Sequence, residues 1–335
     1  MKTHRSKFRI SRNWIKKTAA AVSAATAMLL STGASAVGDP EKWELKFGFI
    51  KLTDMVPLAI AYEKGYFEDE GLYVTLEAQA NWKVLFDRVV SGELDGAHML
   101  AAMPAGAATG VITKSEVISP FTLSYNGAGI TVSNAVWEEM KKTVPMENGK
   151  PVHPVSASAL KPVLESYKKA GKNFNLGMTF PVGTHNYHER YWLAAGGIHP
   201  GFYAPEKGDN SGSIGAEALL SVVPPPQMVP TMEAGTTVGY CVGEPWNQQA
   251  VTKGLGVPVI TSENIWVDGA DKVFGVTKSF YDKYPNTTVR TVKALIRASA
   301  WLDANENANR PEAVKIISRP VYVVAYEHFI ANIMT

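Results

Sequence analysis

The chain has 335 residues, 46% of them hydrophobic, with 33 basic and 31 acidic residues. Residues 1–36 hold seven of the basic residues and no acidic one, so the remainder has a net charge of −5. This balance does not indicate a nucleic-acid partner. The single cysteine, Cys241, excludes an internal disulfide.

Residues 1–36 have the composition of an export signal. A basic start is followed by an apolar run over residues 18–30, too short to span a bilayer, and by the small residues 34–36. We therefore predict cleavage before Val37 and a periplasmic location. No later segment is apolar enough to predict a membrane span, and about 300 residues remain, enough for two domains of about 150.

The first part of the remaining chain alternates between strand and helix patterns. Asp54 is predicted to cap a helix that stops at Gly65, and Asn81 a helix that begins at Trp82. The predicted strands are residues 45–50, 72–76 and 96–100. Strands and helices in this order favour a right-handed parallel α/β layer.

The alternation begins again after Gly129, and a final helical pattern over residues 288–304 is predicted to return to the first unit. Two such lobes, joined by crossing strands, leave a ligand cleft at the carboxyl ends of their strands. We therefore predict an α/β, two-lobed protein that closes about a hinge. The expected lobe boundaries are 37–128 for the first lobe, 129–265 for the second and 266–335 for the return segment.

The stretch PVGTHNYHERYWLAAGG, residues 181–197, predicts a short helix that ends at Gly196. Thr184 is its expected N-cap, which places His185 on the first turn, where backbone N–H groups are unpaired and the helix dipole is positive. A histidine does little to stabilise this end of a helix. We therefore interpret the helix start as a binding surface and His185 as a donor.

Several motifs resemble those of a known family. AIAYEKGYF (59–67) and EGLYV (70–74) resemble the opening of type II periplasmic solute-binding proteins of ABC importers. GTHNYHERYWLAAGG, VVPPPQMV (222–229) and GYCVGEPWNQQA (239–250) resemble the nitrate and bicarbonate branch of that family. The resemblance implies a two-lobed type II fold with a cleft between the lobes, a monomer, and membrane permease subunits as partners, with no cofactor.

The resemblance also implies which residues would hold the anion. Asn126 stands where the family has glutamine, and this shorter amide shifts or loses its contact. The implied positions are Trp82, Asn126, His185, Gly239, Val242 and Lys272.

The residue types at these positions suit nitrate, a planar, monovalent and weak hydrogen-bond acceptor. Lys272 would supply a full charge, worth about 4 kcal/mol at about 4 Å and an effective dielectric of about 20, before desolvation. Two predicted helix starts add backbone donors, and His185 adds a ring N–H that need not be charged. Trp82 would give a flat face, and Gly239 a close approach to the Val242 N–H.

Lys272 also bears on the choice of anion. Bicarbonate has a hydroxyl to donate and is better served by a carboxylate, which in bicarbonate receptors helps to hold calcium. A lysine repels calcium and is expected to leave no acceptor for that hydroxyl. We therefore predict nitrate, with nitrite as a second substrate, and no metal.

Other interpretations stay open. Trp82 is equally explained as core, Gly239 as a strand glycine and Lys272, taken alone, as a solvated charge. The function alternatives are a bicarbonate or other small-anion receptor, an enzyme with Cys241 as nucleophile and His185 as base, and a cytosolic nitrate sensor, which the leader opposes. Family members continue beyond ISRPVYV (317–323), so we expect a fragment or a chain truncated at its C-terminus.

Overall fold

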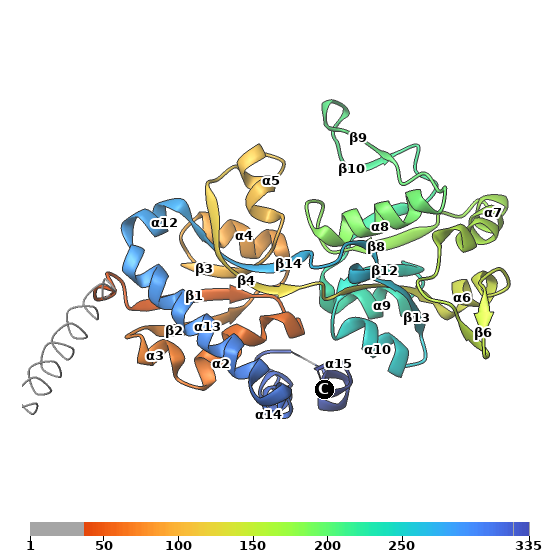
Figure 1. Cartoon of the computed structure of the whole chain (residues 1–335). Coiled ribbons are helices and arrows are strands. Elements are labelled where there is room, and N and C mark those ends of the chain that lie inside the picture. Colours follow the sequence, from red (N-terminus) through yellow and green to blue (C-terminus); the bar gives the residue numbers. More distant parts are fainter. Residues whose placement is uncertain (1–36, 324, 335) are drawn as a thin grey trace, which may run out of the picture. The chain divides into compact units, whose positions relative to one another are not determined.

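The computed structural model describes residues 37–323 and 325–334. The predicted signal peptide and its cleavage site concern residues 1–36, which lie outside the described residues. Within the described part of the chain, no helix is both long and apolar enough to cross a membrane. Two five-stranded sheets, each flanked by helices, form two lobes (Figure 1).

The first lobe contains a sheet in the order β2-β1-β3-β14-β4. Its strands are β1 (Glu44–Phe49), β2 (Tyr73–Ala78), β3 (Gly96–Leu100), β4 (Val117–Tyr125) and β14 (Ala270–Thr277). The predicted parallel layer is confirmed for β1, β2 and β3. The sheet as a whole is mixed, because β14 runs antiparallel to both β3 and β4.

The second lobe contains a sheet in the order β11-β8-β12-β5-β13. Its strands are β5 (Ala128–Ser133), β8 (Asn175–Met178), β11 (Leu219–Val222), β12 (Gly239–Gly243) and β13 (Gly256–Thr261). Strand β8 is parallel to β11 and β12, whereas β5 is antiparallel to β12 and β13. A purely parallel layer is therefore wrong here, because β5 enters from the other lobe in the opposite direction.

Helices surround both sheets. Those that follow first-lobe strands are α2 (Val56–Glu63), α3 (Tyr66–Asp69), α4 (Trp82–Val90), α5 (Met103–Thr109), α12 (Lys278–Lys283), α13 (Pro285–Asn307) and α14 (Arg310–Ile317). The others are α6 (Asn134–Met140), α7 (Lys161–Lys169), α8 (Thr184–Ala195), α9 (Met228–Glu233), α10 (Trp246–Thr252), α11 (Ser262–Ile265) and α15 (Glu327–Met334). Small hairpins pair β6 (Met146–Glu147) with β7 (Lys150–Pro151) and β9 (Phe202–Ala204) with β10 (Asp209–Ile214).

The two predicted helix caps have different outcomes. Asn81 caps α4 as predicted, because its side chain accepts a hydrogen bond from the Val84 N–H at 2.9 Å. The prediction for Asp54 is wrong. A 3-10 turn, η2 (Thr53–Met55), precedes α2, and Met55 is the N-cap without a side-chain bond. The Asp54 carboxylate is instead engaged in ion pairs.

One apolar core lies between the lobes and holds them together. It joins first-lobe residues, among them Trp82 and Leu100, to second-lobe residues, among them Val182, Tyr240 and Trp246. Separate cores lie deeper in each lobe. Because burying apolar area contributes about 25 cal/mol per Å², this shared core stabilises the direct contact between the lobes.

In the described part of the chain, two crossings connect the two sheets. The first crossing is the two-residue link Asn126–Gly127 between β4 and β5, and the second leads from β13 through α11 to β14 (Figure 1). The Asn126 N–H donates to the Gly269 carbonyl at 2.9 Å, so the crossings lie side by side. Asn126 has a φ of 49°, a left-handed conformation that asparagine tolerates better than most residues.

The last helices pack on both lobes. Helix α13 lies against α2 and α3 of the first lobe, and α14 against α2. Helix α15 contacts α14 and also α10 of the second lobe, with its apolar face buried through Phe329 and Ile330. The end of the described chain therefore touches elements of both lobes.

Candidate functional site

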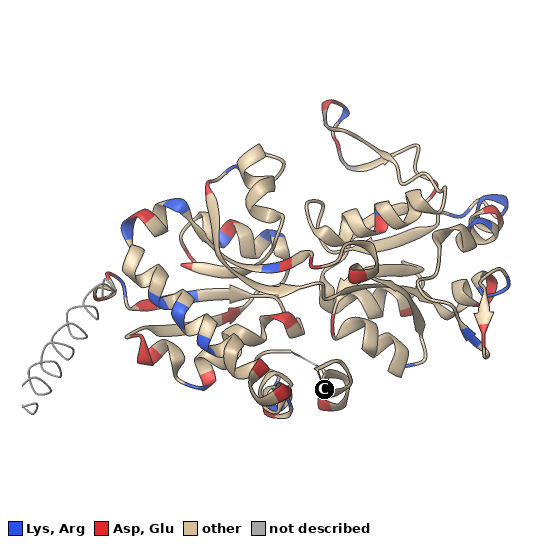
Figure 2. Cartoon of the chain, in the orientation of Figure 1, with Lys and Arg blue, Asp and Glu red and all other residues tan. Residues whose placement is uncertain are grey.

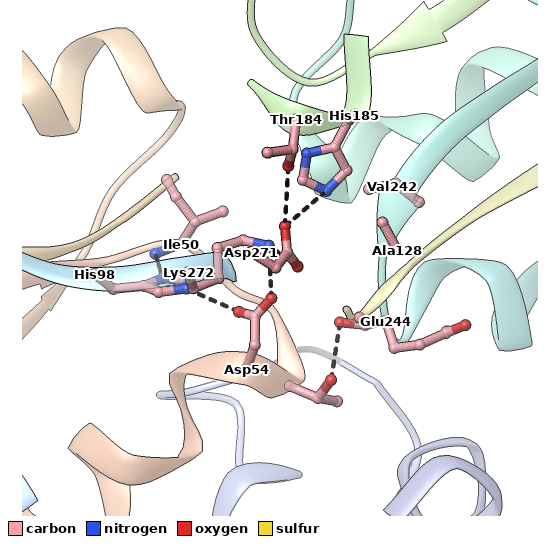
Figure 3. Close-up of polar contacts among 12 residues, drawn as sticks. Ile50, Asp54, His98, Ala128, Thr184, His185, Val242, Glu244, Asp271 and Lys272 are labelled. Atoms are coloured by element: carbon pink, nitrogen blue, oxygen red, sulfur yellow. Dashed lines mark hydrogen bonds and ion pairs between the residues drawn. The ribbon is translucent and has the colours of Figure 1, made fainter. Parts of the chain in front are cut away.

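Helix α8 begins one residue earlier than a Thr184 cap would require. Gly183 is the N-cap, with φ −73° and ψ 145°, and Thr184 is the first helical residue, so the predicted capping role is wrong. The Thr184 hydroxyl is instead directed out of the helix and donates to Asp271 Oδ1 at 3.3 Å (Figure 3). The predicted end of the helix at Gly196 is confirmed.

His185 is the second residue of α8 and is fully buried. Neither ring nitrogen has a hydrogen-bond partner among the described residues, although Nε2 lies 3.9 Å from Asp271 Oδ1. Burial, aided by the charge of Lys272 and opposed by that of Asp271, lowers the pKa of His185 to about 3. The ring is therefore neutral at physiological pH, as predicted, and has one N–H to donate.

Lys272 is also fully buried, in the middle of β14. Its Nζ lies 2.6 Å from Asp271 Oδ2 and 2.8 Å from Asp54 Oδ2. Burial disfavours the ammonium, but these two carboxylates outweigh that cost and raise the pKa of Lys272 above its usual value. The ammonium is therefore charged and already paired.

The local backbone explains how two consecutive residues of one strand reach each other. Successive side chains of a regular strand point to opposite faces. The register of β14 on β4 shifts on either side of Lys272, which marks a bulge. The bulge allows the side chains of Asp271 and Lys272 to meet. Figure 2 shows acidic and basic segments next to each other on β14.

Asp54 extends the cluster to His98 and Trp82. The Asp54 Oδ1 lies 2.8 Å from His98 Nε2, and His98 Nδ1 accepts the Ile50 N–H at 3.4 Å. Burial raises the pKa of Asp54, but Lys272 and His98 together hold it below its usual value. The buried Trp82 ring lies 5.3 Å from the His98 ring, and its Nε1 has no partner among the described residues.

The charges of this cluster correct two expectations from the sequence. Lys272 carries +1 and Asp54 and Asp271 carry −1 each, so these three side chains together have a net charge of −1. Lys272 is therefore not a free cation. The expectation that no acceptor stands beside it is also wrong, because two carboxylates do.

The remaining predicted positions are Val242, Gly239 and Asn126, and they do not all lie at the cluster. Val242, near the end of β12, lies beside Ala128 on the second-lobe side of the cluster (Figure 3). Gly239 begins the same strand, about 10 Å away at about 3.3 Å per residue. A Cβ at Gly239 would lie 2.8 Å from the Thr131 carbonyl oxygen, which explains the glycine by sheet packing. Asn126 lies in the crossing, with its neighbour Gly127 next to Asp271.

The structure thus brings Trp82, Val242, His185 and Lys272 to the junction of the lobes and leaves Gly239 at the far end of its strand. Three polar residues of the junction were missed by sequence reasoning, which gave no role to His98 or Asp271 and assigned Asp54 to a cap. Thr53 donates through its N–H and hydroxyl to the Glu244 carbonyl, at 2.9 and 3.2 Å. The signal that the sequence offered was His98, a polar residue within the predicted buried strand at residues 96–100.

Cys241, the proposed nucleophile of the enzyme alternative, is buried in β12. Burial, with the nearby charges of Glu189 and Asp271, raises the pKa of its thiol well above the usual value. A thiolate is therefore disfavoured. In the part of the chain that the structure describes, no group of three or more His, Cys, Asp or Glu residues is placed to hold a metal ion.

Two mixed α/β lobes, two crossings and a buried polar cluster between the lobes define the class of type II periplasmic binding proteins. The chain belongs to the NMT1-like family, which it matches over residues 38–318. It is 31% identical to the periplasmic nitrate-binding protein NrtA from Synechocystis, whose crystal structure it matches with a TM-score of 0.75, over 89% of this chain and 71% of that chain.

Relatives named for nitrate and relatives named for bicarbonate are both similar to this chain. It is 35% identical over 300 residues to the nitrate/nitrite binding protein NrtA of Synechococcus elongatus, covering 87% of this chain and 61% of that protein. It is 27% identical over 294 residues to the bicarbonate-binding protein CmpA of the same organism, covering 85% and 59%. The chain therefore spans about three fifths of the length of these curated relatives.

Proposed function

We propose that this protein is the periplasmic receptor of an ABC importer and captures nitrate, and also nitrite, between its lobes. The observation that carries the proposal is the fully buried junction of a charged Lys272 with a neutral His185 whose ring nitrogens have no partner among the described residues. The greater identity to a nitrate/nitrite binding protein than to a bicarbonate-binding protein supports this choice of anion.

The donors at this junction suit a planar, weakly accepting anion. The ammonium of Lys272 has three N–H donors and uses two of them on Asp54 and Asp271. The His185 ring, the Thr184 hydroxyl and the Trp82 Nε1–H add neutral donors. Lys272 and Trp82 come from the first lobe and the other two from the second, so an anion contacts all of them only when the lobes are shut.

A bicarbonate receptor is the second candidate function, and one specific observation favours it. The carboxylates of Asp54 and Asp271 lie beside Lys272 and offer acceptors for a hydroxyl. Nitrate has no hydrogen to donate to them. The two anions therefore make different use of the same cluster.

Isothermal titration calorimetry of the purified protein with nitrate, nitrite and bicarbonate, at one ionic strength, tests the proposal. Bicarbonate is measured with and without calcium. We expect saturable binding of nitrate and nitrite, and weaker bicarbonate binding that calcium does not strengthen. Bicarbonate binding tighter than nitrate binding, or binding that requires calcium, would refute the nitrate assignment.

We also propose that binding leaves the anion chemically unchanged. The buried Cys241 and its raised thiol pKa support this view. A Cys241→Ser variant should bind nitrate like the wild type, and chromatography of the bound anion should recover only nitrate.

Residues 37–128 and 266–335 are proposed to act as one lobe and residues 129–265 as the other. The two lobes together are proposed to dock on membrane permease subunits.

A further inference from the structure

The carboxylate of Asp271 stands at the centre of the donors assigned to the anion. Its Oδ2 lies 2.6 Å from Lys272 Nζ, and its Oδ1 lies 3.3 Å from Thr184 Oγ1 and 3.9 Å from His185 Nε2. Figure 3 shows it between Lys272 on one side and Thr184 and His185 on the other. One side chain of the first lobe thus uses donors from both lobes.

This carboxylate has the features of the ligand itself. A carboxylate is planar, carries one negative charge and presents two oxygens attached to one central atom. Nitrate is planar, carries the same charge and differs by a third oxygen. The side chain of Asp271 is only 3% exposed, so it is held among these donors rather than in solvent.

A purely structural role does not account for this second carboxylate. Asp54 alone would neutralise Lys272, and Asp271 brings the cluster to a net charge of −1. Burying an additional unmatched charge costs free energy. It also repels any anion that enters, so its position requires a separate explanation in a site built from donors.

We propose that the Asp271 carboxylate is an internal ligand of this site, which an incoming planar anion must displace from Lys272, Thr184 and His185. The identity of that anion as nitrate rests on the function proposed above. Displacement sets the affinity, because every anion must compete with a carboxylate tethered beside its donors. It also discriminates against weak, singly coordinating anions such as chloride, which cannot replace contacts made by two oxygens.

The carboxylate of Asp271 packs against the neighbouring crossing. Gly127, in the neighbouring crossing, has no side chain, and a Cβ there would lie 3.2 Å from Asp271 Oδ2. A larger residue would therefore hold the carboxylate in place. The bulge in β14 interrupts regular pairing at this point, which leaves this part of the strand less constrained than a regular ladder.

Removing the charge of Asp271 should strengthen nitrate binding. Asp271→Asn keeps the shape of the side chain, and we expect an affinity at least about tenfold greater, equivalent to about 1.4 kcal/mol. The matched control is Asp268→Asn, the same change at an exposed residue of the same segment, whose φ of 56° asparagine accepts. Calorimetry that shows equal or weaker nitrate binding by Asp271→Asn would overturn the proposal.

A second experiment tests the internal ligand without relying on nitrate. In Asp271→Ala, the carboxylate can be replaced by free formate, which should raise the melting temperature in a saturable way. Formate should not do so for the wild type or for Asp268→Ala. A response equal in all three proteins would overturn the proposal. If formate rescues Asp271→Ala but nitrate binds to neither wild type nor Asp271→Asn, the internal ligand stands and the nitrate function fails.

Discussion

The two lobes contribute different chemistry to their junction. All the charged groups of the cluster, Asp54, Asp271 and Lys272, belong to the first lobe or to the strand that returns to it. The second lobe contributes only neutral groups, which are the Thr184 hydroxyl, the His185 ring and the Glu244 carbonyl. The ion pairs of the cluster therefore form within the first lobe, and its polar contacts with the second lobe are made to neutral groups of that lobe.

The charged groups of the first lobe and the neutral donors of the second lobe therefore respond differently to closure of the lobes. Charges that are paired within one lobe stay paired when the lobes move, so their desolvation cost is paid on folding and not again on closure. Neutral donors cost less to bury and depend more on geometry. We infer that the first lobe fixes the charge of the site, whereas the second lobe recognises the outline of the ligand.

Removing the cation of the first lobe should have the largest effect. Lys272→Met leaves the buried carboxylates of Asp54 and Asp271 without their lysine partner, which should lower the free energy of unfolding by about 3–5 kcal/mol. Nitrate affinity should fall by about 100-fold or more, because loss of a buried charge partner costs at least about 2–5 kcal/mol. Urea denaturation and calorimetry measure the two effects.

The control for this variant is Lys278→Met, which removes an exposed lysine just beyond the same strand. It should leave the free energy of unfolding nearly unchanged, as is usual for an exposed ion pair. If Lys272→Met binds nitrate as tightly as the control does, the Lys272 ammonium does not attract the anion.

Removing the neutral donor of the second lobe should have a smaller effect. His185→Ala should weaken nitrate binding by about 1.5–3 kcal/mol, the usual value for one hydrogen bond to a charged partner. His185→Gln retains a neutral N–H and should recover part of this loss. Calorimetry on both variants, with the exposed His328→Ala as control, measures the difference. A Gln variant no better than the Ala variant would argue that His185 only fills space.

The neutrality of His185 predicts how stability depends on pH. Its folded pKa of about 3 lies below its usual value of 6.5, so the unfolded chain takes up the proton first as the pH falls. From pH 7 to pH 5 this should remove about 2 kcal/mol of stability, at about 1.4 kcal/mol per pH unit below 6.5. His185→Gln should lose less stability over the same interval in urea denaturation.

The pH dependence of stability must be compared between the variant and the wild type, because the buried Glu189 changes stability with pH in the opposite direction to His185. Burial raises the pKa of this carboxyl well above its usual value, and the neighbouring Arg190 and Cys241 backbone oppose that shift only in part. The folded state therefore holds the proton more strongly, and the contribution of Glu189 decreases as the pH rises above 4.5. Equal pH dependence of wild type and His185→Gln would contradict a buried neutral His185.

The sequence predicted what is decided locally. The cap at Asn81 and the parallel strands of the first lobe follow from short-range patterns, and the glycine after α8 ended that helix as expected. The motif around residue 185 and the place of Lys272 correctly brought these two residues to one junction. These features depend on few neighbours along the chain.

The features that the sequence did not predict depend on contacts between residues far apart in the chain. Asp54 stands before a helix with proline in its first turn, which is the pattern of a cap, and only the approach of β14, more than 200 residues later, pairs it with Lys272. The bulge that turns Asp271 towards its neighbour has no local signal. Gly239 stays a prediction, because a glycine needed for sheet packing cannot be distinguished by sequence from one that approaches a ligand.

The hydrogen bond between Asn126 and Gly269 has a mechanical consequence. Two short peptide segments tied side by side behave as one joint with a defined axis, rather than as two independent linkers. Bending about that axis keeps the tie intact, whereas twisting one lobe against the other would break it. Each opening and shutting movement should therefore retrace the same arc and return the same surfaces to each other.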